Sequence, residues 1–340
     1  MCLIHLDGGL NMEESKVVTL YDWIDETTSK MEELTNEPYL DSLILTLEAL
    51  FYGDIHDEQH EDVTDQIRSF LPFIKLDDYT TEEIRKAIQL IVLKGMKENT
   101  QQQHIITPET IALFIGYLAD KLTTELEDVR LFDPASGIGN LLLTVMNHLE
   151  KPIKAYASEV DPTLLKISLL NANLQKKRVE YFHQDSLRPL LLDPVDLVVA
   201  DLPVGYYPDD IQASEYELQA SEGHSYAHHL FIEQSLIYTK PGRFLIFIIP
   251  EFLFESNQSE ALYSFIQKHA HIIGLIQLPD TAFASKEHKK SIFILQKRGA
   301  NTADLKEPLL AQLPSFSNTV GMEDMLDQLN QWFASTDIHL

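Results

Sequence analysis

The chain has one cysteine, few basic residues and no long apolar run. Because Cys2 is the only cysteine, a disulfide or a cysteine-based zinc site within the chain is excluded, and a reducing, cytoplasmic setting fits. Of the thirteen histidines, His228 and His229 are adjacent and cannot both face one site from a regular helix, so no metal site is predicted. No apolar run reaches the roughly 20 residues that a membrane helix needs. Residues 1–11 lack the basic and apolar regions of a secretory signal, so we expect neither a signal nor a membrane partner.

Basic residues are scarce relative to acidic ones. There are 26 Lys and Arg against 53 Asp and Glu, for a formal net charge of −27. Since phosphate backbones attract basic surfaces, a chain this acidic is expected to bind bare nucleic acid poorly unless it has a local basic face or a basic partner. Two short basic clusters, residues 176–178 and residues 286–290, are typical of solvated loops, although the second could meet a phosphate.

The N-terminal third has a helical pattern. Apolar residues recur at spacings of three and four over 17–31, 40–50 and 84–92, and Thr80 and Glu83 have the spacing of a capping box. The acidic stretch 54–65 is typical of a solvated loop, with a cation site as the alternative. No polar constellation in this third suggests chemistry. We therefore expect a leader or tag-like segment over 1–12 and a helical cap or partner-binding domain over 13–100.

Strands and helices alternate from residue 129 to residue 298. We expect strands over 129–132, 153–158, 179–183, 195–200, 243–249, 272–278 and 291–296, and helices over 140–149, 162–174, 226–238 and 259–269. This alternation predicts an α/β fold with a mostly parallel sheet and helices on both faces. The strand at 243–249 is so apolar that it must be central. The tail, 301–340, holds one helical segment over 322–332 that is expected to pack back on the sheet.

A small-residue turn follows the first of these strands. Asp133-Pro134-Ala135-Ser136 leads into Gly137 and Gly139, which let the backbone turn tightly and bring a ligand close to the start of the next helix. Three more acids, Glu159, Asp185 and Asp201, stand at the carboxyl ends of the next three strands. Ligands bind beyond these ends in open α/β sheets, so the four acids predict one binding site.

The acids suit a ligand that contains an adenosine and an amino acid. Glu159 could accept two hydrogen bonds from a ribose diol, and Asp185 could accept one from an adenine amino group. Asp133 could face a cationic end, either an ammonium or, through water, a sulfonium. A pyrophosphate does not fit, because no lysine or arginine lies near the turn. Upstream, Thr107-Pro108 is typical of a helix N-cap followed by proline at the first helical position.

These motifs resemble the class I S-adenosylmethionine-dependent methyltransferases. More narrowly, they resemble the N6-adenine DNA methylases related to the modification subunit of type I restriction systems, over about 102–298. The resemblance implies a Rossmann-like methyltransferase fold over 101–300, a seven-stranded mostly parallel sheet, and S-adenosyl-L-methionine as the cofactor. The residues that it implies at the cofactor are Ile106, Thr107, Pro108, Asp133, Ala135, Gly137, Gly139, Glu159, Val160, Asp185 and Ser186.

The catalytic motif departs from the family pattern. The family has Asn or Asp, two prolines and an aromatic residue after the fourth strand, whereas this chain has Asp201-Leu202-Pro203-Val204. The resemblance implies that Asp201, Leu202 and Pro203 are catalytic, with the Asp201 side chain and the Leu202 carbonyl accepting hydrogen bonds from the target amino group. The fourth residue normally stacks on an extruded base, which Val204 cannot do. Tyr206 or Tyr207 could replace it, so Val204, Tyr206 and Tyr207 are the candidate substrate-binding residues.

The substrate stays open at the level of sequence. The resemblance favours an amino nitrogen, with adenine in DNA first, reached through a separate specificity partner because little chain follows the last strand. Two alternatives are a cofactor-binding module without methyl transfer and a methyltransferase acting on RNA or protein. The long acidic segment 205–225 is either a lid over the site or disordered surface. A homo-oligomer is compatible with the sequence.

Overall fold

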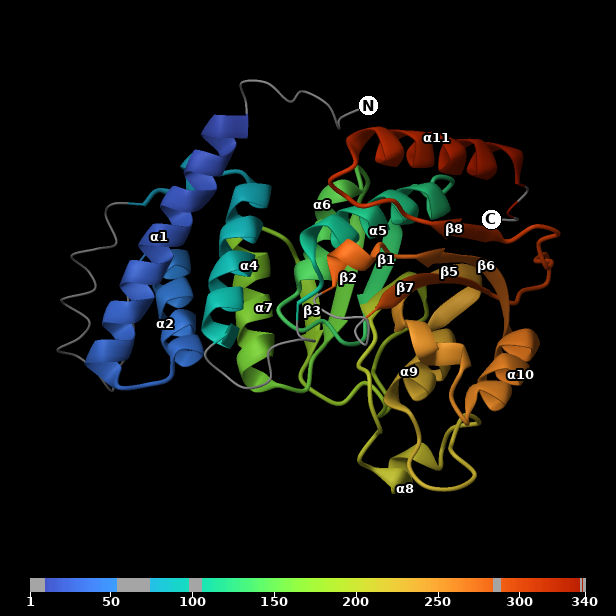
Figure 1. The fold of residues 1–340 in the computed structure, drawn as a ribbon. Helices are drawn as coiled ribbons and strands as arrows, with labels where there is room; N and C mark the ends of the chain where they lie inside the picture. Colours follow the sequence, from blue (N-terminus) through green and yellow to red (C-terminus); the bar gives the residue numbers. More distant parts are fainter. Residues whose placement is uncertain (1–9, 54–73, 98–105, 284–288, 337, 339–340) are drawn as a thin grey trace.

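Eight strands form one sheet in the order β3-β2-β1-β4-β5-β7-β6-β8, with helices on both faces (Figure 1). This computed structural model describes residues 10–53, 74–97, 106–283, 289–336 and 338. The acidic stretch 54–65, the linker 98–105, Lys286 and most of the expected leader lie outside the described residues. The predicted fold class is confirmed: the structure is α/β, with a mostly parallel sheet in a Rossmann-like strand order and helices on both faces.

The sheet is parallel except at one strand. Its strands are β1 (Val129–Asp133), β2 (Ile153–Ser158), β3 (Val179–Phe182), β4 (Val195–Asp201), β5 (Thr239–Pro250), β6 (Ala270–Gln277), β7 (Lys290–Lys297) and β8 (Leu309–Gln312). Strand β7 lies antiparallel between β5 and β6, and all other neighbours are parallel. The seven expected strands are present, and β5 is central. The eighth, β8, was not expected, because only Leu309 of its four residues is fully buried.

The strand order reverses between β1 and β4, and ligands bind at such a switch point. Asp133 ends β1 and Asp201 ends β4. Asp201 is in register with Ile248 of β5, and two residues later Pro250 is in register with Lys290 at the start of β7. Because β7 is antiparallel, its first residue reaches the same edge of the sheet as the carboxyl ends of β1 and β4.

Separate helices cover the two faces of the sheet. On one face α5 (Glu109–Leu122), α6 (Asn140–His148) and α11 (Thr319–Ser335) form a core with Leu197 and Ile246. On the other face α9 (Ala227–Ile237) and α10 (Ser259–His269) pack on Val198 and Phe247, together with the short elements α8 (Asp210–Ala213) and η3 (Glu251–Phe254). Adjacent residues of one strand thus enter opposite cores, as the pleat requires. A further short turn of helix, η4 (Asp280–Ala282), precedes β7.

The N-terminal helices pack against the side of the α/β part. They are α1 (Leu10–Thr35), α2 (Tyr39–Tyr52) and α4 (Thr81–Lys97), with the short η2 (Leu76–Asp78), and they lie beside α7 (Pro162–Leu174) in Figure 1. The expected capping box is present, because Thr80 Oγ1 accepts from the Glu83 amide at 3.2 Å and Glu83 Oε2 accepts from the Thr80 amide at 2.7 Å. Their shared core includes Ile138 of the glycine turn and Ile167 of α7. None of the described helices is long and apolar enough to cross a membrane.

Candidate cofactor and acceptor site

One small cavity joins predicted site residues from three separate segments. It has a volume of about 30 Å³, enough for one water-sized group. Thr107 precedes α5, Asp133 ends β1 and Ala135 lies in the turn after it, and Asp201 ends β4. The full lining is Thr107, Asp133, Ala135, Ser136, Ile138, Asn140, Leu141 and Asp201. The topology therefore brings the first and the fourth of the predicted acids to one place.

The turn after β1 requires glycine. Gly137 and Gly139 have φ values of 52° and 78°, in the left-handed region that favours glycine. A Cβ at position 139 would also lie 2.5 Å from the Oγ of Ser168, a buried residue of α7. The sequence prediction of a tight glycine turn at the start of a helix is thus confirmed, and the close approach of α7 gives a second reason for glycine at 139.

Glu159 holds this turn in place. Its Oε2 accepts a hydrogen bond from the Gly137 amide at 2.8 Å, and its Oε1 accepts from the amides of Val160 and Asp161 at 2.9 Å each. The carboxylate at the end of β2 therefore lies directly over the turn at the end of β1. The side chain of Val160 is 65% exposed, so this residue meets Glu159 through its backbone.

Asp133 is a buried acid that pairs with no cation among the described residues. It is 1% exposed, and its Oδ1 accepts a hydrogen bond from the Ala135 amide at 3.0 Å. Burial, with smaller contributions from the negative charges of Glu159 and Asp201, raises the pKa of Asp133 to about 8. A carboxyl group in this state would gain from a positive charge brought close to it, which is what a ligand with an ammonium or sulfonium group supplies.

Asp185 lies at the third strand end and is tied to a tyrosine. Its Oδ2 accepts a hydrogen bond from the Tyr207 hydroxyl at 2.5 Å, and its Oδ1 accepts from the Leu187 amide at 2.9 Å. Burial raises the pKa of Tyr207, and Asp185 raises it further, so the phenol keeps its proton and acts as the donor. The neighbouring Ser186 donates to the Pro134 carbonyl at 2.5 Å, which links the third strand end to the glycine turn.

Both carboxylate oxygens of Asp201 have partners within the protein. Lys290 Nζ lies 2.5 Å from Oδ1, and the Thr107 hydroxyl donates to Oδ2 at 3.3 Å. The side chains of Lys290 and Asp201 are 12% and 15% exposed. The prediction that Lys290 belongs to a solvated cluster is therefore wrong. The prediction that Thr107 caps a helix is also wrong, because α5 begins at Glu109 with Pro108 in the N-cap position.

The rest of the catalytic motif faces two ways. Leu202 is buried and its amide donates to the Ile248 carbonyl at 3.1 Å, whereas Pro203 and Val204 are exposed. Tyr206 is 59% exposed, and its ring stacks on that of Tyr226 with centroids 4.8 Å apart and planes at 15°. Of the two candidate tyrosines, Tyr206 thus presents an aromatic face to solvent, and the hydroxyl of the other points to Asp185.

The segment 205–225 is largely exposed and irregular, but hydrogen bonds tie it to the rest of the protein at several points. The Gly205 carbonyl accepts from the Ala227 amide at 2.9 Å, and the carboxylate of Glu233 in α9 accepts from the amides of Glu217 and Leu218 at 2.9 and 2.8 Å. Its ends are joined by an antiparallel bridge between Tyr206 and Tyr226. These contacts hold parts of the segment close to Asp201–Val204, which it follows in the chain.

Two polar residues of the site were missed at the level of sequence. Arg85 of α4 is fully buried and donates from Nη1 to Asn140 Oδ1 at 2.7 Å. Asn140, the first residue of α6, donates in turn to the Thr107 carbonyl at 2.8 Å. No local pattern indicates these contacts, since they join residues far apart in the chain. The N-terminal helices therefore support the turn and the segment that line the small cavity.

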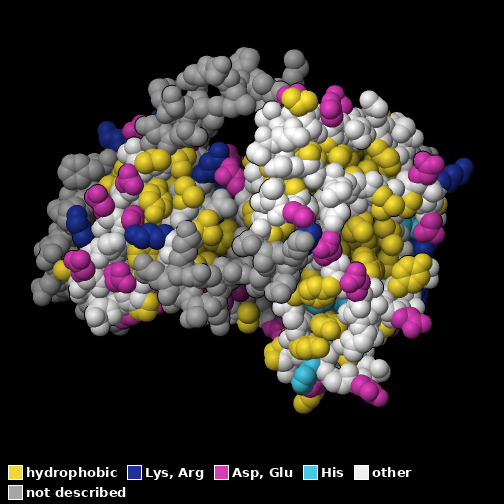
Figure 2. Space-filling view, in the orientation of Figure 1, with side chains coloured by type: hydrophobic (Ala, Val, Ile, Leu, Met, Phe, Trp, Pro, Cys, Tyr) yellow, Lys and Arg dark blue, Asp and Glu magenta, His cyan; other side chains and the backbone are white. Residues whose placement is uncertain are grey.

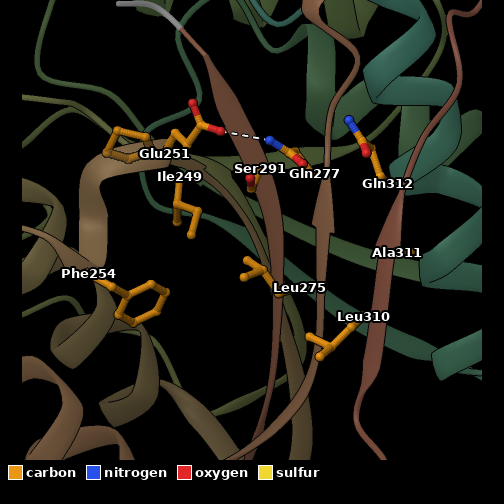
Figure 3. Close-up of a pocket in the computed structure, with 10 residues that line it drawn as sticks. Ile249, Glu251, Phe254, Leu275, Gln277, Ser291, Leu310, Ala311 and Gln312 are labelled. Carbon is orange, nitrogen blue, oxygen red and sulfur yellow. Dashed lines mark hydrogen bonds between the residues drawn. The ribbon is translucent and has the colours of Figure 1, made fainter.

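A larger cavity lies outside this site. It has a volume of about 420 Å³ and lies between η3, β6 and β8, where Glu251 Oε1 accepts a hydrogen bond from Gln277 at 2.7 Å (Figure 3). Ser291 lines it, whereas the preceding residue, Lys290, reaches Asp201. Because successive side chains of a strand point to opposite faces, the cavity and the Lys290–Asp201 pair lie on opposite sides of β7.

Comparisons with known proteins show the family of the chain. Residues 91–310 match the N-6 DNA methylase family, and residues 18–96 match the YtxK N-terminal helical domain. The uncharacterized protein YtxK of Bacillus subtilis is 45% identical over 325 residues, which are 95% of this chain and 99% of that protein.

Solved structures show the same fold. A Listeria monocytogenes protein described as a candidate class I S-adenosylmethionine-dependent methyltransferase is 39% identical, with a TM-score of 0.88 over 94% of this chain and 99% of its own. A modification subunit from Vibrio vulnificus, assigned to a type I restriction enzyme, is 14% identical, with a TM-score of 0.65 over 84% of this chain and 65% of its own. The match to the Listeria protein covers nearly the whole of both chains, whereas the match to the Vibrio subunit shows a shared fold alone. The expected cofactor, S-adenosyl-L-methionine, is that of the matched family. The chain belongs to the N-6 DNA methylase family.

Proposed function

We propose that this methyltransferase-family protein binds S-adenosyl-L-methionine at the four strand-end acids and transfers a methyl group to an amino nitrogen, with adenine in DNA as the favoured acceptor. The observation that carries the proposal is the shared cavity of Asp133 and Asp201, which lies against the glycine turn. One acid there suits the cationic end of a cofactor, and the other suits an acceptor amine. We also propose the division into a helical domain, 13–100, a catalytic domain, 101–300, and a tail, 301–340.

The residues present fit the cofactor. Glu159 is held over the glycine turn, where a ribose diol would donate to its oxygens. Asp185 can accept from an adenine amino group at the end of β3, and Ala135, Gly137 and Gly139 leave room for close approach because they carry small or no side chains. When bound, the cofactor supplies an electrophilic methyl group on a sulfonium. We propose that the cofactor also lies against the other residues predicted at its site, which are Ile106, Thr107, Pro108, Val160 and Ser186.

The acceptor would be held by the catalytic motif. The Asp201 carboxylate and the Leu202 carbonyl both accept hydrogen bonds, so together they can take the two hydrogens of an amino group and direct its lone pair toward the methyl donor. This is a positioning effect, supported by the charge of Asp201 as the nitrogen becomes positive. Pro203 fixes the backbone that presents the carbonyl, and Tyr206 offers an exposed ring on which a base could stack.

The scarcity of basic surface suggests that a second protein contributes to nucleic-acid binding. On the face in Figure 2, Lys and Arg side chains of the described residues lie singly among acidic ones and form no continuous stripe. A type I modification subunit from Vibrio vulnificus shares the fold. We therefore propose that DNA is reached through a separate, basic specificity partner, in the cytoplasm, with a homo-oligomer as a further form of assembly.

A second function is favoured by two observations. Val204 stands where the family has an aromatic residue, and the Asp201 carboxylate already accepts a hydrogen bond from Lys290. Both would suit a protein that binds the cofactor without transferring its methyl group and uses the N-terminal helices to contact a partner. RNA or a basic protein as the acceptor would keep the cofactor site and change only the second substrate.

Calorimetry first tests the cofactor site, which all of these functions require. S-adenosylmethionine should bind, and Glu159→Ala or Asp185→Ala should weaken it by about tenfold or more, since each removes a charged hydrogen-bond acceptor. Glu180→Ala, exposed on β3, is the matched control and should leave affinity unchanged. Tritiated methyl transfer into genomic DNA, total RNA and cell lysate then identifies the acceptor. Transfer that survives Asp201→Ala unchanged would refute the catalytic assignment, and absence of cofactor binding would refute the proposal as a whole.

A further inference from the structure

Lys290 makes the contact that an acceptor amine is expected to make. Its Nζ donates to Asp201 Oδ1 at 2.5 Å, and both side chains are largely buried. Under the proposed function, the acceptor's amino group donates to this same carboxylate. Since the Thr107 hydroxyl already bonds Oδ2, a new amine must take the place of Lys290 on Oδ1 or share a crowded carboxylate with it.

Displacing Lys290 leaves an ammonium that needs a new anion. Moving a largely buried charge away from its partner is costly unless another partner compensates. Among the residues that the structure describes, two acids near the start of β7 are already engaged, since Asp280 pairs with Lys289 at 2.7 Å and Glu251 accepts from Gln277. A neutral amine brings no negative charge. An acceptor that also carries a phosphate within reach of the Lys290 side chain brings both partners at once, an amine for Asp201 and an anion for Lys290.

We propose that Lys290 occupies the acceptor-amine position on Asp201 and selects acceptors that carry an anionic phosphate within reach of its side chain. In this scheme the phosphate pairs with the Lys290 ammonium, and the Asp201 carboxylate that Lys290 leaves accepts a hydrogen bond from the amine. The inference rests on the proposed function and narrows its substrate class to nucleotides within a charged strand, as opposed to free nucleosides or uncharged amines. It makes Lys290 a specificity-determining residue.

The first test measures binding alone. S-adenosylhomocysteine is compared by calorimetry with a cofactor analogue that carries an amine in place of the transferable methyl group. In the wild type, Lys290 should disfavour the amine analogue. In Lys290→Met, which keeps the length but removes the charge, the analogue should gain about tenfold relative to S-adenosylhomocysteine, because Asp201 is free to accept. Lys289→Met removes the neighbouring charge, whose partner Asp280 is exposed, and should leave the ratio unchanged.

The second test addresses the phosphate. With S-adenosylhomocysteine bound, a short single-stranded oligonucleotide containing one adenine is compared with the same sequence built on neutral methylphosphonate linkages. The wild type should prefer the charged strand by about tenfold or more, and Lys290→Met should lose most of that preference, whereas Lys289→Met should keep it. Lys290→Gln provides a second variant if Lys290→Met does not fold.

The outcomes separate the two proposals. Failure to bind S-adenosylhomocysteine contradicts the proposed function. Normal binding with an unchanged analogue ratio in Lys290→Met and Lys290→Gln overturns the placement of Lys290 on the acceptor position. A preference for the charged strand that Lys289→Met removes as fully as Lys290→Met overturns the selective role, since it would reflect general charge alone.

Discussion

Arg85 donates a hydrogen bond to Asn140 across 2.7 Å and thereby joins the N-terminal helices to the α/β part. The Asn140 side chain passes the connection to the Thr107 carbonyl at 2.8 Å, and the Thr107 hydroxyl lies 3.3 Å from Asp201. One continuous set of polar contacts therefore runs from a helix outside the α/β fold to the predicted catalytic acid. The N-terminal helices are in this sense part of the site.

Replacing Arg85 should damage both stability and cofactor binding. Arg85 is fully buried and also donates to Glu82 at 2.8 Å, so Arg85→Met leaves several acceptors without a donor. We expect a loss of about 2–4 kcal/mol in the free energy of unfolding, measured in urea. The affinity for S-adenosylmethionine should fall as well, because Thr107 and Asn140 lose their support.

The neighbouring Lys86 provides the control for this variant. It pairs with Glu109 at 3.3 Å but is 35% exposed, so Lys86→Met should cost less than about 1 kcal/mol. Equal losses in the two variants would show that the buried contacts of Arg85 add nothing beyond a surface ion pair.

The sequence predicted those parts of the site that follow from strand order. The acids Asp133, Glu159, Asp185 and Asp201 could be recognised because parallel strands bring their carboxyl ends to one edge, so position along the chain is enough. The glycine turn could be recognised because its conformation is local.

What the sequence did not predict depends on contacts across the fold. The contact between Lys290 and Asp201 joins residues 89 apart and exists only because β7 runs antiparallel beside β5. The contact between Arg85 and Asn140 joins residues 55 apart and depends on how a separate group of helices docks. Strand β8 has too few buried residues to show a pattern, and it forms because the edge of β6 offers it backbone partners.

Gly139→Ala should destabilise the protein through two separable effects. The residue has a φ of 78°, and its new Cβ would lie 2.5 Å from Ser168 Oγ. We expect a loss of about 3 kcal/mol in unfolding free energy, together with weaker cofactor binding. Gly53→Ala isolates the backbone effect, because Gly53 has a φ of 70° and no atom of the described residues would lie within 4 Å of its new Cβ, and it should cost about 1 kcal/mol.

Ser168→Ala tests the steric part of this loss. Combined with Gly139→Ala, it removes the oxygen that the new methyl group would meet. The double variant should therefore regain part of the unfolding free energy that Gly139→Ala loses beyond the loss of Gly53→Ala. No recovery would place the whole cost in the backbone conformation of the turn.

Cofactor binding should strengthen as pH rises toward 8. Asp133 has a pKa raised to about 8, chiefly by burial, so below that pH it is mainly protonated before a cation binds. A cationic ligand favours the ionised form, and binding must then release a proton. The affinity for S-adenosylmethionine should rise by up to about tenfold per pH unit between pH 6 and 8 and level off above, as proton linkage requires.

Calorimetry in two buffers of different ionisation enthalpy measures this proton release directly. Asp133→Asn should bind more weakly and with little pH dependence over the same range, because the amide has no proton to release. A wild-type affinity that does not change with pH would contradict the role of Asp133 at the cationic end.

Two adjacent buried histidines should make the protein sensitive to acid. His228 and His229 in α9 are both fully buried, and burial lowers the pKa of His228 to about 3 and that of His229 to about 4, from an ordinary value of 6.5. The unfolded chain therefore binds protons more readily than the native chain below pH 6.5. Their contribution to stability is fully present above that pH and is lost as the pH falls. Between pH 6.5 and 5 we expect a loss of about 1–2 kcal/mol per histidine.

Asp133 has the opposite effect on the pH dependence of stability, so the measurement is made in variants that lack its carboxyl group. Its raised pKa means that the native chain binds the proton more tightly than the unfolded chain, whose ordinary value is 3.8, so its contribution grows as the pH falls from about 8 toward 4. Urea unfolding is therefore followed from pH 7 to pH 5 in Asp133→Asn and in the same background with His228→Leu. The second variant should lose less stability over this range, because only His229 remains to be protonated on unfolding. If the unfolding free energy of the two variants changed equally with pH, His228 would have the same pKa in the native and the unfolded chain. That result would contradict the effect expected from the burial of its ring beside Tyr226 and Phe252.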